Sequence, residues 1–215
     1  MPRLTVKSYA ELIHTPLYGQ MRILHEQKYP TQAPGIFKVR YYRPALRLMN
    51  RYFRHGNNPT EIPTSALLIP GCTGAQHQRQ NNWRALQAFM DSSQSDRILT
   101  MSQTNTYDLT LGNITLRSTP DFTGLDTHTN EVHYLFFDCG QQGPEDPTEL
   151  EILRTMAELF HHVLTENGID CPLKRVEYVH LQSDTVFRWN GNPRKRTIQR
   201  AENTAGAIAT LWDSI

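Results

Sequence analysis

The sequence predicts a mixed α/β domain in which helices come first and a sheet flanked by helices follows. Apolar side chains such as Leu48, Met49, Tyr52 and Phe53 recur at helical spacing in the first part of the chain. After about residue 107, short runs of β-branched and aromatic residues replace that pattern. Two long amphipathic stretches then alternate with such runs. This order excludes a helical bundle and a β-sandwich.

Length and composition indicate one folded domain over 1–215. The chain has 215 residues, of which 38% are hydrophobic, and it holds 8 Phe, 9 Tyr and 3 Trp. A chain of this size buries roughly 70% of its unfolded surface, so a disordered protein is excluded. We expect a mainly helical, basic part over 1–64 and a sheet-containing core over 65–215.

The sequence also predicts where the protein works. No window approaches the roughly 20 apolar residues that cross a bilayer, and the first seven residues lack the apolar stretch of a signal peptide. Three widely spaced cysteines, Cys72, Cys139 and Cys171, do not form a disulfide framework. We therefore expect a soluble, cytoplasmic protein with no membrane partner.

Three helices are predicted in the N-terminal part. Ser8 and Glu11 have the spacing of a capping box, so a first helix begins at Ser8. A second covers 17–28 after Pro16. A third covers 43–54, where Pro44 suits the first turn. The run 65–69 then resembles a short buried strand that Pro70 and Gly71 end.

The remaining elements follow from alternation and periodicity. We expect a helix over 83–90 and strands over 97–101, 109–111, 114–118, 132–137, 176–181 and 185–189. The run 132–137 is the most apolar, so we expect it to be a central strand. Long helices are predicted over 149–166, which Asn167 and Gly168 end, and over 197–212.

Charge is distributed unevenly between the two halves. Residues 1–107 hold 13 Lys and Arg against 5 Asp and Glu, a net charge of +8, whereas residues 108–215 hold 9 against 16, a net charge of −7. This pattern favours a basic face for a polyanion. The alternative is that two halves of one domain complement each other.

Basic residues gather in two places that would suit phosphate groups. Four arginines of the predicted helix 43–54 step by 4, 4 and 3 residues and share one face: Arg43, Arg47, Arg51 and Arg54. A second cluster, Arg194, Lys195 and Arg196, lies beside Arg200 and Trp189. Each phosphate contact releases counterions and makes binding sensitive to salt. The alternative is a solvated helix face and an exposed turn.

Two carboxylates are placed to share a cation. Asp121 follows one predicted strand and Asp138 ends the next. Carboxylates at the ends of neighbouring strands can converge on Mg²⁺, which prefers one or two carboxylates, water and substrate phosphate. The alternative is that Asp121 caps a turn and Asp138 ends a strand. Asp126 could replace either carboxylate.

The segment Pro120-Asp121 … Asp138-Cys139-Gly140 resembles the motif of the PD-(D/E)XK nuclease superfamily, most of all its RecB-type exonuclease branch. That branch has helices before the motif, and a long helix, a strand and a terminal helix after it, as predicted here over 149–166, 176–181 and 197–212. The resemblance implies a restriction-endonuclease-like mixed sheet flanked by helices, DNA or RNA as partner, and Mg²⁺ held by Asp121 and Asp138 for phosphodiester hydrolysis.

Departures from the motif imply a degenerate site. Gly140 stands where the family has its lysine, and Gln141, Gln142 or Lys174 could substitute for it. The branch's Gln and Tyr are absent from the helix 149–166, and its early His has only His55 as a counterpart. We therefore expect a nucleic-acid-binding subunit of a larger complex with protein partners. The alternatives are an active Mg²⁺-dependent nuclease and a protein-interaction subunit that binds no nucleic acid.

A rival site lies in the segment 70–77. Cys72 stands between glycines after a predicted strand, and His77 follows five residues later. Such a pair can form a thiol nucleophile and its base. The alternative is a tight turn before a helix.

Overall fold

Eight strands and six α-helices lie in the residues that the computed structural model describes, 1–29, 41–72, 76–97, 99–101, 105–126, 129–144 and 146–215, with backbone alone for 99–101. The strands are β1 (Arg3–Thr5), β2 (Leu99–Met101), β3 (Tyr107–Leu111), β4 (Ile114–Ser118), β5 (Phe122–Asp126), β6 (Glu131–Asp138), β7 (Val176–His180) and β8 (Thr185–Phe187). The α-helices are α1 (Val6–His14), α2 (Leu17–Lys28), α4 (Arg43–Arg54), α5 (Gln76–Asp91), α6 (Pro147–Glu166) and α7 (Lys195–Ser214).

The strands form two mixed sheets. The large sheet has the order β2-β5-β6-β7-β8, with β6 parallel to β7 and the other neighbours antiparallel. The small sheet has the order β1-β4-β3. β6 is the central strand of the large sheet, as its apolar run predicts. The α/β class and the helical N-terminal part are therefore confirmed.

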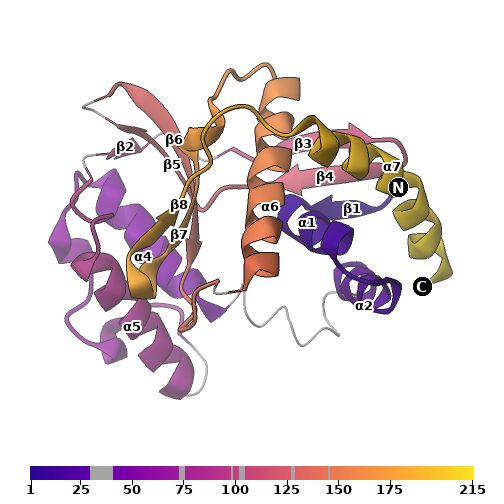
Figure 1. Cartoon of the computed structure of the whole chain (residues 1–215). Coiled ribbons are helices and arrows are strands. Elements are labelled where there is room, and N and C mark those ends of the chain that lie inside the picture. Colours follow the sequence, from indigo (N-terminus) through magenta and orange to yellow (C-terminus); the bar gives the residue numbers. More distant parts are fainter. Residues whose placement is uncertain (30–40, 73–75, 98, 102–104, 127–128, 145) are drawn as a thin grey trace.

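Helices cover both faces of the large sheet (Figure 1). On one face, α4 and α5 pack through Phe53 and Phe89 onto Phe122, Leu135 and neighbouring side chains. On the other face lies α6, whose Phe160 contacts the ring of Phe136 edge to face. Because side chains alternate along a strand, even-numbered residues of β6 face α6 and odd-numbered ones face α4 and α5.

The N-terminus is built into the second half of the chain. β1 pairs in parallel with β4, with Leu4 opposite Leu116. α1 then packs against α6, and the Tyr9 hydroxyl donates to the carbonyl of Ala201 in α7 at 2.6 Å. In Figure 1, α6 lies between the large sheet and a group formed by α1, the small sheet and α7. This packing anchors the start of α1 rigidly.

Most predicted elements are confirmed, and four differ. α5 begins at Gln76, seven residues before the predicted start at 83. α1 begins earlier than predicted, because Thr5 is the N-cap and accepts from the Ser8 amide at 3.1 Å. The predicted buried strand 65–69 was wrong. Its centre is the 3₁₀ turn η2 (Ala66–Leu68), and Leu67 is 77% exposed. β5 was not predicted, because Gly124 and the polar residues around it hide its alternation.

The uneven charge is only partly neutralised within the molecule. Arg97 from the basic half contacts the fully buried Glu177 of the acidic half at 2.9 Å. By contrast, Arg51, Arg117 and Arg194 find their partners within their own halves. No helix in the described part of the chain is both long and apolar enough to span a membrane.

Candidate carboxylate site at the end of the large sheet

The fold brings Asp121 and Asp138 to the same end of the large sheet. Asp121 directly precedes β5, Asp138 ends β6, and the two strands are antiparallel, with Phe122 opposite Leu135. The start of one strand therefore lies beside the end of the other. Since Phe122 and Leu135 face α4 and α5, Asp121 and Asp138 lie on the opposite face, toward α6. The sequence analysis placed both aspartates at the ends of strands. In the structure they lie at the same end of the sheet because the start of β5 adjoins the end of β6.

Asp121 is held in an environment that disfavours its charge. Its Oδ2 accepts a hydrogen bond from the Phe137 amide at 2.9 Å. Burial, together with the nearby charge of Asp138, raises the pKa of Asp121 from 3.8 to about 6, against the opposing effects of that hydrogen bond and of Lys7. A carboxyl with a raised pKa beside a second carboxylate attracts either a proton or a cation.

Asp138 is fixed by two donors. Its Oδ1 accepts from the Gly140 amide at 2.7 Å, and its Oδ2 accepts from the Tyr178 hydroxyl. Burial and the Asp138 charge raise the pKa of Tyr178, so the phenol stays protonated and remains a donor. Tyr178 lies on β7, which neighbours β6 in the sheet. The sequence pattern of β7 did not indicate that Tyr178 would bind Asp138.

Lys7 brings a positive charge to the two carboxylates. Its Nζ lies 5.9 Å from the ring centroid of Tyr178, and its charge lowers the pKa of Asp121. The side chain is exposed, but the helix that carries it is anchored by the Thr5 cap and by buried Val6. The sequence analysis missed Lys7, because more than a hundred residues separate it from Asp121 in the chain.

The loop after Asp138 leaves little room for a side chain at position 140. A Cβ added at Gly140 would lie 3.0 Å from Asp138 Oδ1, which is closer than nine in ten real Cβ contacts. A lysine at this position would therefore require Asp138 to shift by a few tenths of an ångström. Gln141 and Gln142, the predicted substitutes, are both exposed. The Gly140 carbonyl lies 3.1 Å from His180 Nε2, which anchors the loop to β7.

The pair meets the minimum requirement for Mg²⁺ but forms no closed cage. In the residues that the structure describes, no group of three or more His, Cys, Asp or Glu side chains could hold a metal ion. Mg²⁺ commonly uses one or two carboxylates and takes its other ligands from water and phosphate. Two hard oxygen donors, one with a raised pKa, fit that role.

Three other predicted participants lie elsewhere. Lys174 is in η3 (Leu173–Arg175), just before β7 begins. Asp138 pairs with His180, the last residue of β7, so it lies at the opposite end of the sheet. Asp126 is at the far end of β5, about 16 Å from Asp121 at 3.3 Å per residue. His55 contacts Glu61 at 2.5 Å. The structure therefore does not bring any of them to the carboxylates.

The arginine row of α4 passes close to the site. Arg43, Arg47 and Arg54 are exposed, and at steps of four, three and four residues they share one stripe with Asn50. The Asn50 amide donates to the Asp121 carbonyl oxygen at 3.2 Å. The row thus runs past the start of β5. Arg51 is also exposed, but it forms an ion pair with Glu61 at 2.7 Å.

The second basic cluster is divided between core and surface. The Arg194 guanidinium contacts the fully buried Glu158 at 2.8 Å and also pairs with Glu151, so it connects α7 to α6. Its side chain is only 16% exposed, which leaves little of it for a phosphate. Lys195 and Arg196 are exposed.

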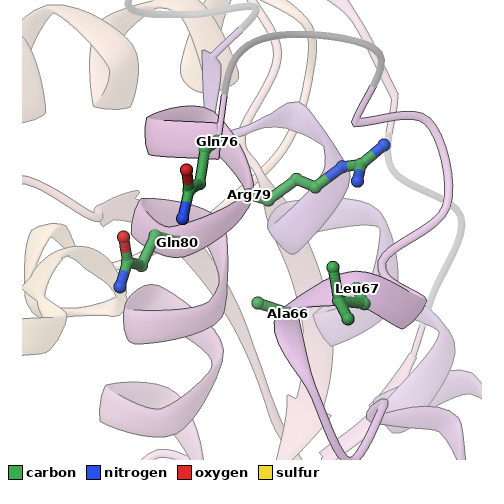
Figure 2. A pocket seen from close by; sticks show the side chains of 5 residues that line it. All are labelled: Ala66, Leu67, Gln76, Arg79 and Gln80. Atoms are coloured by element: carbon green, nitrogen blue, oxygen red, sulfur yellow. The ribbon is translucent and has the colours of Figure 1, made fainter.

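The rival thiol site has a buried cysteine. Burial raises the pKa of Cys72, so the thiol is a poor nucleophile at neutral pH. The Cys72 carbonyl accepts from Arg79 Nε at 3.1 Å. Residues 73–75 of the predicted motif lie outside the described part of the chain. A pocket of about 410 Å³ lies nearby between η2 and α5, lined by Ala66, Leu67, Gln76, Arg79 and Gln80. Figure 2 shows these five side chains.

No family model, curated protein or solved structure matches this chain significantly. Its function is therefore argued from the carboxylate site and the basic surfaces beside it.

Proposed function

We propose that this protein binds nucleic acid, and that it has a PD-(D/E)XK nuclease-like fold with a degenerate active site. The order of elements after Asp138, which is α6, β7, β8 and α7, supports the proposal, because a long helix, a strand and a terminal helix follow the motif in the RecB-type branch. The departure at Gly140 supports the degenerate form. We further propose that the protein acts within a larger complex.

One observation carries the proposal. Two carboxylates lie at one end of the sheet, and the arginine stripe of α4 passes the same end on the opposite face, where Asn50 contacts the backbone carbonyl of Asp121. Arginines bind the phosphates of a nucleic-acid strand whatever its base sequence. The carboxylate pair can then meet one of those phosphates through a divalent cation.

The residues of the site have distinct roles in this proposal. Asp121 and Asp138 would hold Mg²⁺, which when bound neutralises charge on a phosphate and activates water. Tyr178 fixes the orientation of Asp138 through its hydroxyl. Lys7 adds a positive charge on the face toward α6. Arg43 and Arg47 on α4 would position the nucleic-acid strand from the opposite face of the sheet.

A second function, Mg²⁺-dependent phosphodiester hydrolysis, is favoured by Lys7. Lysine is the residue that the motif lacks at position 140, and Lys7 brings an ammonium group to the same two carboxylates from a different element. In that case Lys7 stabilises charge on the phosphate, and Asp121 and Asp138 are essential. The remaining alternative, a protein-interaction subunit, predicts no binding to nucleic acid.

The test combines cleavage and binding. Labelled single- and double-stranded DNA and RNA are incubated with Mg²⁺ or Mn²⁺ and with the wild-type, Asp121→Ala, Asp138→Ala or Lys7→Ala protein, and binding is titrated with salt. Salt-sensitive binding without cleavage supports the degenerate binder. Cleavage that all three variants lose supports the active nuclease. Absence of both binding and cleavage refutes the nucleic-acid proposal.

A further inference from the structure

A cleft lies between α1, α6 and α7, away from the carboxylates. Its volume is about 380 Å³, and seven residues line it: Ile13, His14, Glu151, Thr155, Arg196, Thr197 and Arg200. Glu151 and Thr155 belong to the first turns of α6, which follows Asp138 in the chain. Arg196 and Arg200 belong to the first turns of α7, where they lie four residues apart and share one face.

The cleft has an excess of positive charge. Two guanidinium groups line it, those of Arg196 and Arg200, against one carboxylate, that of Glu151. Glu151 is already paired with Arg194, whose side chain is only 16% exposed and also contacts the buried Glu158. The exposed Arg196 and Arg200 therefore determine what the cleft attracts.

The polar groups of the cleft are held in place. Arg200 donates to the Ile13 carbonyl at the end of α1, and His14 Nε2 lies 2.8 Å from Thr155 Oγ1. Burial and the charges of Arg200 and Arg194 lower the pKa of His14, against the opposing effect of Glu151. The imidazole is therefore neutral at pH 7, and an anion in the cleft would favour its protonated form.

One helix joins this cleft to the carboxylates. Lys7 and His14 are seven residues apart on α1, so they lie on the same side of that helix about 10 Å apart. Lys7 lies beside Tyr178 and Asp121 at the sheet end, and His14 lies in the cleft.

We infer that the cleft between α1, α6 and α7 binds a phosphate of the same nucleic-acid strand that meets Asp121 and Asp138. Bidentate guanidinium groups are well matched to phosphate oxygens, and two of them on one helix face form a compact anion site. The strand then contacts the protein on two sides of the carboxylates, through α4 and through this cleft. The inference rests on the proposed function, because the strand is the nucleic acid proposed there.

Binding of a labelled single-stranded oligonucleotide tests the inference across a range of salt concentrations. Arg196→Gln removes an exposed arginine of the cleft, and Arg84→Gln, which removes an exposed arginine of α5 outside the cleft lining and outside both basic clusters, is the matched control. We expect Arg196→Gln to weaken binding several-fold and to reduce the salt slope by about 0.7, the value for one contact to a single strand. Equal effects of the two variants would overturn the inference but leave the proposed function intact.

A second measurement does not depend on nucleic acid. Inorganic phosphate is titrated into the full chain, and the His14 pKa is followed by NMR. We expect phosphate to raise that pKa in the wild type and in Arg84→Gln, but not in Arg196→Gln. If phosphate raises the pKa but no oligonucleotide binds, the phosphate site stands and the nucleic-acid function fails. If phosphate leaves the pKa of His14 unchanged, the cleft is not a phosphate site.

Discussion

Replacing Asp121 with Asn should stabilise the protein at neutral pH. The pKa of Asp121 is raised from 3.8 to about 6, so the folded state favours its protonated form. Below pH 3.8 this difference costs nothing; the cost grows as pH rises from 3.8 to about 6 and is complete above that. About two pKa units at roughly 1.4 kcal/mol each give an upper limit of about 3 kcal/mol.

The asparagine fits the same hydrogen bonds. Its carbonyl oxygen can accept from the Phe137 amide, as Asp121 Oδ2 does at 2.9 Å. Thermal unfolding in metal-free buffer at pH 4 and pH 7.5 measures the effect. For a chain of this length, about 3 kcal/mol corresponds to roughly 6–12 °C at most. Asp170→Asn, at an exposed position, is the control.

Added Mg²⁺ should narrow the difference in stability between the two proteins. A cation that binds the folded wild type stabilises it by about 1.4 kcal/mol at ten times its dissociation constant, whereas the variant keeps one carboxylate and gains less. The stability that Asp121→Asn gains over the wild type should be larger at pH 7.5 than at pH 4. If this gain is the same at both pH values, the two carboxylates do not share a buried site. If Mg²⁺ stabilises both proteins equally, they do not hold the metal.

Three further outcomes follow from the structure. Glu177→Gln should destabilise the fold by about 3–5 kcal/mol at pH 7 in denaturant unfolding, because the buried carboxylate pairs with Arg97, Arg188 and His133. Those partners hold the pKa of Glu177 at about 2 despite its burial, so its stabilising effect is complete above pH 4.5 and is lost as pH falls toward 2. Arg47→Gln should weaken oligonucleotide binding and its salt dependence more than Arg51→Gln, because Arg51 is paired with Glu61; equal effects would contradict a role for the α4 stripe. The Cys139 thiol should resist alkylation at pH 8 until the protein unfolds, since burial and the two carboxylates raise its pKa; rapid labelling of the folded protein would contradict that burial.

The sequence alone predicted much of the secondary structure. The bounds of α2 and α4 agree with the prediction, because each helix has local stop signals and, in α4, a strong apolar face. Strands were predicted over 109–111 and 114–118 from their alternating residues, and β3 and β4 pair there in antiparallel order. The central strand β6 was predicted from its continuous apolar run.

Elements with weak local signals needed the tertiary structure. β5 contains Thr123 and Gly124, and its strand conformation depends on pairing with β6 on one side and β2 on the other. The run 65–69 was apolar enough to predict a buried strand, yet no sheet edge receives it and Leu67 and Leu68 stay exposed. Apolar character by itself does not specify burial.

The candidate site shows the same division. The sequence predicted that Asp121 follows one strand, that Asp138 ends another and that α4 presents arginines on one face, because these properties depend on residues close in the chain. Only the tertiary structure placed Lys7 and Tyr178 beside the carboxylates and Asn50 against Asp121, because these contacts join segments that are distant in sequence. Long-range packing decides which charges meet, and no local pattern records it.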